Sequence, residues 1–244
     1  ARGVPVVHHQ GCSIDKVLPP MDGDFTVTYR TPGSPEQTVA TQRLQLMWMD
    51  DPAPGIDRGS FGATVRGTFV PDTDGDWELA LTSVGPAVLR LDGEPVVDLS
   101  VPQTGGAFFG VGSPEVRASV PLEAGRTYEV EVEYPHLDFG QLRGLIVGAA
   151  GPKTGDTIAE AAAVAAGADI AVVVVGTNAD WETEGEDRTT MSLPGDQDEL
   201  IERVAAANPC TVVVVNAGSP VSMPWLDRVA AVMQVWFPGE EAGN

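Results

Sequence analysis

Two stretches in the second half of the chain decide the fold: residues 170–175 read Ile-Ala-Val-Val-Val-Val, and residues 211–215 read Thr-Val-Val-Val-Val. Continuous apolar runs rich in β-branched residues are typical of parallel strands that are covered on both faces of a sheet. Residues 196–207 lie between the two runs and end at Asn208-Pro209, which predicts a helix. The order strand, helix, strand predicts an open α/β sheet.

Three further segments extend this α/β region. Residues 157–166 are Ala-rich and end at Gly167, as helices do. Residues 230–236 predict a third strand, and residues 4–8, which read Val-Pro-Val-Val-His, predict another one at the start of the chain. Both ends of the chain therefore resemble each other and differ from the middle.

The middle of the chain, residues 24–148, consists of short segments of alternating apolar and polar residues separated by Gly, Pro and Asp. Residues 128–134, Tyr-Glu-Val-Glu-Val-Glu-Tyr, are one example. This period of two predicts about eight antiparallel strands with one solvated face, hence a β-sandwich or barrel. Asp92-Gly93, between two apolar runs, fits a tight hairpin turn.

We therefore expect an α/β plus all-β chain: an open α/β sandwich sheet interrupted by an inserted antiparallel β-sandwich. The expected boundaries are residues 1–20 for the first part of the α/β domain, 21–152 for the insert, and 153–244 for the continuation of the α/β domain, truncated at its end. Such an insertion is tolerated when the two ends of the inserted domain lie close together.

The net charge of the chain argues against some classes of binding partner. Fourteen Lys and Arg residues stand against 35 Asp and Glu residues, which gives a net charge of −21. A field of this sign repels nucleic acid and anionic lipid, and no apolar run approaches the roughly 18 residues needed to cross a bilayer. We expect neither a nucleic-acid nor a membrane partner.

The polar loop that follows the first β-branched run is the candidate site. Residues 181–188 read Trp-Glu-Thr-Glu-Gly-Glu-Asp-Arg, with four acids, one Arg and one Trp. Reactive groups of open α/β sheets lie beyond the carboxyl ends of the strands, where this loop begins. The alternative is a solvated loop in an acidic protein.

These residues resemble a known family. The loop, with residues 191–194 (Met-Ser-Leu-Pro) and Gln197, is similar to the E-x-E-G-x-D-R … L-x-L-P … Q signature of glycoside hydrolase family 3 β-glucosidases. Further similar stretches are residues 11–14, 214–221 and 235–244, with Glu240 where Gln is usual. The middle of the chain resembles the protective-antigen-type β-sandwich that some members carry as an insert, on residues 75–83, 91–93, 97–98 and 125–128.

The resemblance implies roles for the loop carboxylates. Members are retaining enzymes, in which one carboxylate attacks the sugar and a second carboxyl protonates the leaving oxygen. The general acid/base would be Glu184, directly before the Gly, with Glu182 as the alternative. An ion pair between Asp187 and Arg188 would position the loop.

The resemblance also implies substrate contacts from aromatic side chains. Trp181 would help to exclude water from the acid/base. Phe108 and Phe109, in a loop of the insert that is rich in small residues, would contact the aglycone, although one of the pair could instead belong to the core. No cofactor is implied. We expect no metal, because Asp50-Asp51 lacks a second oxygen-rich loop, and Cys12 and Cys210 are expected to be packing residues.

The expected function is that of one part of a longer enzyme. A retaining β-glucosidase would hydrolyse terminal non-reducing β-D-glucosyl residues of a β-glucoside or glycosylated small molecule. The nucleophile of the family lies on an N-terminal (β/α)₈ barrel that is missing here, so we expect this chain alone to be inactive.

Two alternative functions stay open. The chain could be a carbohydrate-binding module without a catalytic role. A related specificity is also compatible, such as β-xylosidase, N-acetylglucosaminidase or natural-product glucosidase. Twelve Arg against two Lys suggest a GC-rich bacterial genome, while a secreted or a cytoplasmic location fits the sequence equally well.

Overall fold

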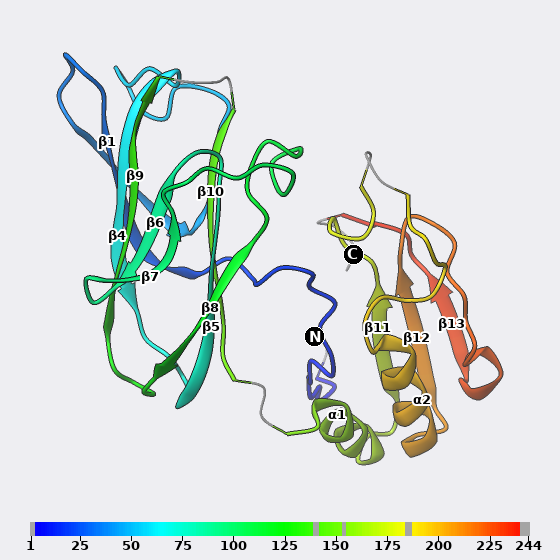
Figure 1. Cartoon of the computed structure of the whole chain (residues 1–244). Coiled ribbons are helices and arrows are strands. Elements are labelled where there is room, and N and C mark those ends of the chain that lie inside the picture. Colours follow the sequence, from blue (N-terminus) through cyan, green and yellow to red (C-terminus); the bar gives the residue numbers. More distant parts are fainter. Residues whose placement is uncertain (1–2, 139–141, 153–154, 184–186, 240–244) are drawn as a thin grey trace. The chain divides into compact units, whose positions relative to one another are not determined.

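The computed structural model describes residues 3–138, 142–152, 155–183 and 187–239. Within them the chain forms strands, two α-helices and one 3₁₀ helix (Figure 1). In chain order these are β1 Asp22–Arg30, β2 Gln37–Arg43, β3 Gln45–Trp48, β4 Ser60–Phe69, β5 Gly75–Ser83, β6 Ala87–Leu91, β7 Glu94–Leu99, β8 Val116–Leu122, β9 Tyr128–Asp138, β10 Arg143–Ala150, α1 Thr157–Ala166, β11 Ala171–Gly176, α2 Gln197–Ala207, β12 Thr211–Asn216, η1 Leu226–Arg228 and β13 Ala231–Gln234.

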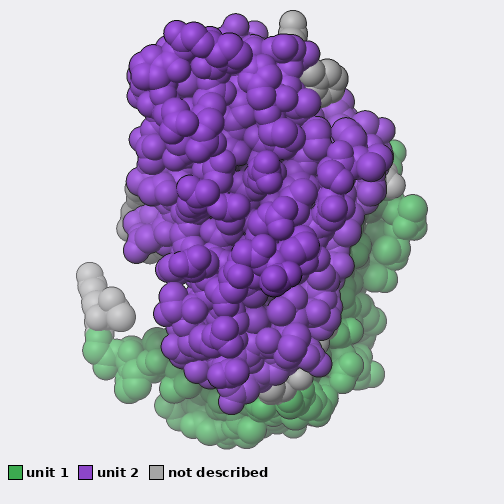
Figure 2. Space-filling view, turned by 60° about the vertical axis from the view of Figure 1, so that its left-hand side comes forward, with its two compact units in different colours: residues 1–16, 154–244 green, residues 17–153 purple. Residues whose placement is uncertain are grey.

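The chain divides into two compact units, which are coloured separately in Figure 2. Unit 1 comprises residues 1–16 and 154–244, and unit 2 comprises residues 17–153. Unit 1 therefore contains α1, α2 and the last three strands, while unit 2 contains β1 to β10.

Unit 1 is built on a parallel sheet in the order β11-β12-β13. The register pairs Ala171 with Thr211 and Gly176 with Asn216, so β11 and β12 end side by side. Helix α1 begins where the Asp156 carboxylate accepts a hydrogen bond from the Ala159 amide (2.9 Å), which satisfies one of the free amides of the first turn. The combination of a parallel sheet in unit 1 with antiparallel sheets in unit 2 confirms the predicted fold class.

Two expectations for unit 1 are wrong. Residues 4–8 form no strand in the described chain, because β-branched residues make a strand only where a neighbouring strand pairs with their backbone. The β-branched runs are also not covered on both faces: α1 and α2 lie on one side of the sheet in Figure 1. On the other face Val172 and Val174 of β11 are 60% and 66% exposed.

Unit 2 consists of two antiparallel sheets. One has six strands in the order β2-β1-β4-β9-β6-β7, and the other has four in the order β3-β10-β5-β8. Asp92 and Gly93 join β6 to β7, and both have positive φ (50° and 84°), as this tight turn requires.

No helix in the described part of the chain is long and apolar enough to cross a membrane.

The core of unit 2 contains an aromatic cluster around one buried cation. Phe61 packs edge-on against Tyr29 and Trp48, with ring centroids 5.7 and 5.3 Å away. The Arg143 guanidinium lies over the Phe61 ring at 4.4 Å, and Arg143 is only 1% exposed. It donates hydrogen bonds to three backbone carbonyls, those of Phe61 (2.7 Å), Gly59 (2.9 Å) and Leu137. The buried charge is therefore stabilised by carbonyl dipoles and by a ring face.

Replacing this cation should strongly destabilise unit 2. In Arg143→Met the three buried carbonyls lose a charged donor, so we expect the free energy of unfolding to fall by at least about 4 kcal/mol. Urea denaturation followed by tryptophan fluorescence measures the change. Arg66→Met is the matched control, since Arg66 is an exposed partner of Glu131 and should cost less than about 1 kcal/mol. Similar losses of unfolding free energy in both variants would contradict the structural role of Arg143.

Tyr134 belongs to the same cluster, with its ring centroid 5.5 Å from that of Trp48, and it should make unit 2 sensitive to alkali. Burial raises the pKa of Tyr134 to about 12, although the nearby charge of Arg143 acts in the opposite direction. An unfolded Tyr ionises near pH 10, so between about pH 10 and pH 12 only the unfolded state loses this proton and the native state loses stability. We expect the melting temperature of Tyr134→Phe to fall less over this range than that of the parent. Melting temperatures that fall equally with pH in the two proteins would refute this prediction.

Candidate functional site

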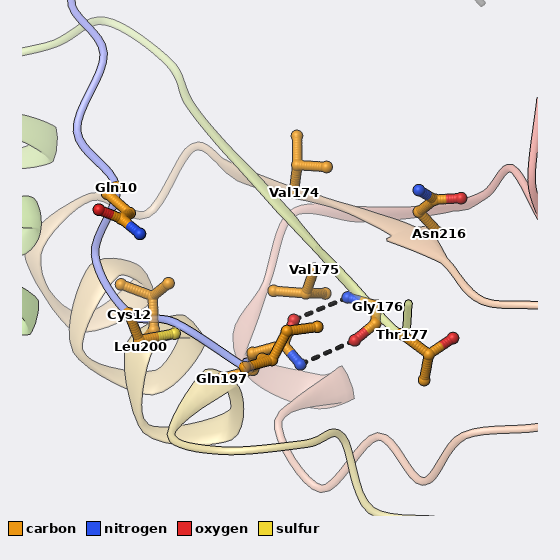
Figure 3. Close-up of a pocket in the computed structure, with 10 residues that line it drawn as sticks. Gln10, Cys12, Val174, Val175, Gly176, Thr177, Gln197, Leu200 and Asn216 are labelled. Atoms are coloured by element: carbon orange, nitrogen blue, oxygen red, sulfur yellow. Dashed lines mark hydrogen bonds between the residues drawn. The ribbon is translucent and has the colours of Figure 1, made fainter. Parts of the chain in front are cut away.

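The side chain of Gln197, from α2, fixes the end of β11 (Figure 3). Gln197 is only 4% exposed. Its amide oxygen accepts a hydrogen bond from the Gly176 amide (2.7 Å). Its amide nitrogen donates to the Gly176 carbonyl (2.8 Å) and to the Pro194 carbonyl (2.9 Å). Gln197 therefore replaces a neighbouring strand at this point, and it borders a hollow of about 240 Å³ that Cys12 and Asn216 also line.

The candidate loop leaves β11 in one tight turn. The Thr177 amide donates to the Asn216 carbonyl (3.0 Å), which keeps the loop beside the end of β12. The amides of Trp181 and Glu182 both donate to the Asn178 carbonyl (3.0 Å each). This turn points the Glu182 carboxylate back toward the residues that follow β12.

The Glu182 carboxylate is fully engaged in hydrogen bonds. Its Oε1 accepts from the hydroxyls of Thr177 (2.7 Å) and Ser219 (2.8 Å) and from the Ser219 amide (3.3 Å). Its Oε2 accepts from the Gly218 amide (3.1 Å). A Cβ at Gly218 would lie 2.5 Å from Oε2, so a larger residue here would displace the carboxylate from this position. The carboxylate thus joins the loops that follow two adjacent strands.

This environment keeps Glu182 ionised. Partial burial raises its pKa, but the hydrogen bonds from Thr177, Ser219 and Gly218 together outweigh burial and hold the pKa below the usual value. Donors that favour the charged form have this effect on any carboxylate. Glu182 therefore lacks the raised pKa that a general acid requires.

Arg188 belongs to the same hydrogen-bond network, but its acidic partner is not the one expected from the sequence. Its Nη1 is 3.8 Å from Glu182 Oε1 and donates to the Ser219 hydroxyl (3.1 Å), while its Nη2 donates to the Ser192 carbonyl (2.7 Å). The expected ion pair with Asp187 is not formed, although both residues are described, and Asp187 is exposed. Arg188 is more strongly stabilised by the partly buried carboxylate of Glu182 than it would be by an exposed one.

Trp181 contacts residues near the start of the chain. Its indole N–H donates to the Ile14 carbonyl (2.6 Å), and Lys16 Nζ lies 4.3 Å from the ring centroid. Trp181, Lys16 and Arg188 line a hollow of about 290 Å³. The structure thus brings Trp181, Glu182 and Arg188 together, while Glu184 lies outside the described residues.

The two phenylalanines of unit 2 differ in their surroundings. Phe108 packs against its own unit, since a Cβ at Gly144 of β10 would lie 2.2 Å from its ring. Phe109 is 87% exposed. Both have left-handed backbone conformations (φ 54° and 60°), which bulky residues rarely adopt and which cost about 1–3 kcal/mol each. Hydrogen bonds from Gly105 to Gly110 (2.8 Å) and from other backbone amides hold the loop in this shape.

The described residues contain no group of three or more His, Cys, Asp or Glu side chains arranged to hold a metal. Cys12 is half-buried, and burial raises its pKa, which is the behaviour of a packing residue. Cys210 is exposed, so the expectation that it packs is wrong. Its position directly after Pro209, in the turn before β12, leaves it at the surface.

Sequence reasoning missed the partners of Glu182, namely Thr177, Gly218 and Ser219. Thr177 follows the β11 run, and Gly218-Ser219 follow the β12 run, so small and hydroxyl residues occupy matching places after adjacent strands. Because parallel strands end at the same edge of a sheet, this spacing could have predicted the network.

Relatives of known sequence cover nearly the whole chain. A β-glucosidase from Rhizobium radiobacter is 39% identical over 97% of this chain, which spans 30% of that protein. A protein described as probable β-glucosidase I from Aspergillus terreus is 40% identical over 88% of this chain, which spans 28% of it. The chain thus spans about a third or less of the length of these relatives, which come from bacteria and fungi.

Solved structures agree with the sequence relatives. The β-glucosidase of Kluyveromyces marxianus in complex with glucose matches 99% of this chain with a TM-score of 0.85 and 30% identity, and this chain covers 31% of it. The sequence profile of the glycosyl hydrolase family 3 C-terminal domain matches residues 21–244. The chain therefore belongs to the glycosyl hydrolase family 3 C-terminal domain family.

Proposed function

We propose that this chain is the C-terminal part of a retaining β-glucosidase and that Glu184 is its general acid/base. The observation that carries the assignment is the environment of Glu182. Both oxygens of Glu182 accept hydrogen bonds within the protein, and its pKa is lowered. Of the two carboxyls that the signature allows, Glu184 is the one left to protonate a leaving group.

The nucleophile in this proposal comes from a (β/α)₈ barrel N-terminal to the chain. Retaining enzymes place their two carboxyl groups about 5–5.5 Å apart, so that one attacks the anomeric carbon while the other protonates the glycosidic oxygen. The same residue then acts as a base and takes a proton from the water that releases the sugar. We expect the 244-residue chain alone to hydrolyse no β-glucoside.

A glucosyl substrate is favoured because the relatives described above are named β-glucosidases. Rates on 4-nitrophenyl β-glucoside, β-xyloside and N-acetyl-β-glucosaminide, measured on the complete enzyme, would test this preference. A faster rate on either of the latter two would change the assigned specificity but leave the acid/base proposal intact.

Removing the acid/base tests the central claim. In the complete enzyme, Glu184→Gln keeps the side-chain shape but cannot protonate the leaving group, so we expect kcat to fall by about 10²- to 10⁴-fold. The exposed Glu199→Gln on α2 is the control and should keep the parent rate. Activity of Glu184→Gln within about tenfold of the parent would refute the proposal and leave Glu182 as the acid/base or a carbohydrate-binding role without catalysis.

We also propose that Phe109 contacts the aglycone of the substrate. The loop holds this side chain in solvent at the cost of a left-handed backbone, which suggests a use for the exposed ring. Aromatic faces pack well on sugar C–H groups and on aryl aglycones. Phe108 would support the loop by its packing on Gly144.

The two phenylalanines should respond differently to truncation. Phe109→Ala should raise KM for aryl β-glucosides by roughly fivefold, equivalent to about 1 kcal/mol of aromatic contact, without lowering the melting temperature. Phe108→Ala should lower the melting temperature, because it removes packing. An unchanged KM in Phe109→Ala for both aryl and alkyl glucosides would contradict the aglycone contact.

A further inference from the structure

Ser219 connects both ends of the loop segment that carries Glu184. Its hydroxyl donates to Glu182 Oε1 (2.8 Å) and accepts from Arg188 Nη1 (3.1 Å). Glu182 lies two residues before Glu184, and Arg188 lies four residues after it. The side chains of the two residues that flank this five-residue segment thus meet at one hydroxyl group, which follows β12 and not the strand that bears the loop.

This connection is protected from water and is charged. The side chains of Arg188 and Glu182 are only 13% and 18% exposed, so their attraction is screened less than that of a surface pair. Thr177 and the Gly218 amide hold the carboxylate from two further directions, and the Ser192 carbonyl holds the guanidinium. Each member has its partners inside the protein, as a rigid network requires.

We propose that Glu182 is a positioning residue that, through Ser219 and Arg188, fixes both ends of the segment bearing the acid/base. The inference rests on the proposed role of Glu184. Glu182 itself exchanges no proton with the substrate in this reaction. Its effect on the rate arises because a carboxyl displaced by about 1 Å from its working geometry can lose about 10²-fold in rate.

The test is a double-substitution cycle in the complete enzyme, with kcat and KM measured on 4-nitrophenyl β-glucoside. Glu182→Gln keeps the size of the side chain but offers an amide nitrogen where Gly218 or Ser219 needs an acceptor. We expect kcat to fall by about 10- to 100-fold, with KM within about threefold of the parent. In the Glu184→Gln background the same substitution should have almost no further effect, because the residue on which Glu182 acts has already been disabled.

Ser219 supplies a second pair of variants in case Glu182→Gln folds poorly. Ser219→Ala removes the shared hydroxyl and should lower kcat severalfold, whereas Ser219→Thr keeps the hydroxyl and should restore much of the lost rate. Circular dichroism and melting temperature establish that each variant is folded. The exposed Glu199→Gln again serves as the control at the parent rate.

Each contrary outcome identifies which claim fails. The positioning role would be overturned if kcat of Glu182→Gln stayed within twofold of the parent, or if the two losses of kcat multiplied fully in the double variant. In either case, a large loss of kcat in Glu184→Gln would still uphold the proposed function. Azide can attack a glycosyl-enzyme without a general base, so glucosyl azide should form with Glu184→Ala and not with Glu182→Ala. The reverse pattern would make Glu182 the acid/base and overturn both claims.

Discussion

The candidate site depends on the close approach of two backbone segments at the ends of β11 and β12. A Cβ on Gly176 would lie 1.8 Å from the Asn216 carbonyl oxygen, so any other residue here would force the strand ends apart. The Thr177 amide donates to the same carbonyl (3.0 Å), and Gln197 occupies the other edge of Gly176. A glycine at this point therefore determines how near the two following loops can be.

That proximity determines the chemistry of the Glu182 carboxylate. Its four donors come from Thr177 after β11 and from Gly218 and Ser219 after β12. Neither loop alone supplies enough donors to hold a partly buried carboxylate in its charged form, and a buried charge without donors would be neutralised by protonation. The ionised state of Glu182 is thus a consequence of the parallel sheet and not of the local sequence.

The sequence predicts best what local patterns control. The β-branched runs and the Ala-rich segment gave β11, β12 and α1 nearly to the residue, because periodicity and helix ends are local signals. The strand expected at residues 4–8 does not form, since a strand also needs a partner that no local pattern specifies. Arg188 similarly pairs with Glu182 instead of its neighbour Asp187, because burial at the strand ends, invisible in a loop sequence, decides which carboxylate attracts it more strongly.

Under the proposed function, the two glutamates of the Glu-x-Glu spacing in the loop meet opposite requirements. A carboxyl that must donate a proton near neutral pH needs few donors around it, whereas a carboxylate that anchors a loop needs many. One group cannot satisfy both requirements, because each hydrogen bond that improves the anchor lowers the pKa and weakens the acid. Glu182 has the donors of an anchor. If Glu184 is the acid/base as proposed, a second carboxyl two residues away would let the loop keep that anchor and still offer a proton, which would be a physical reason for the signature to contain two glutamates.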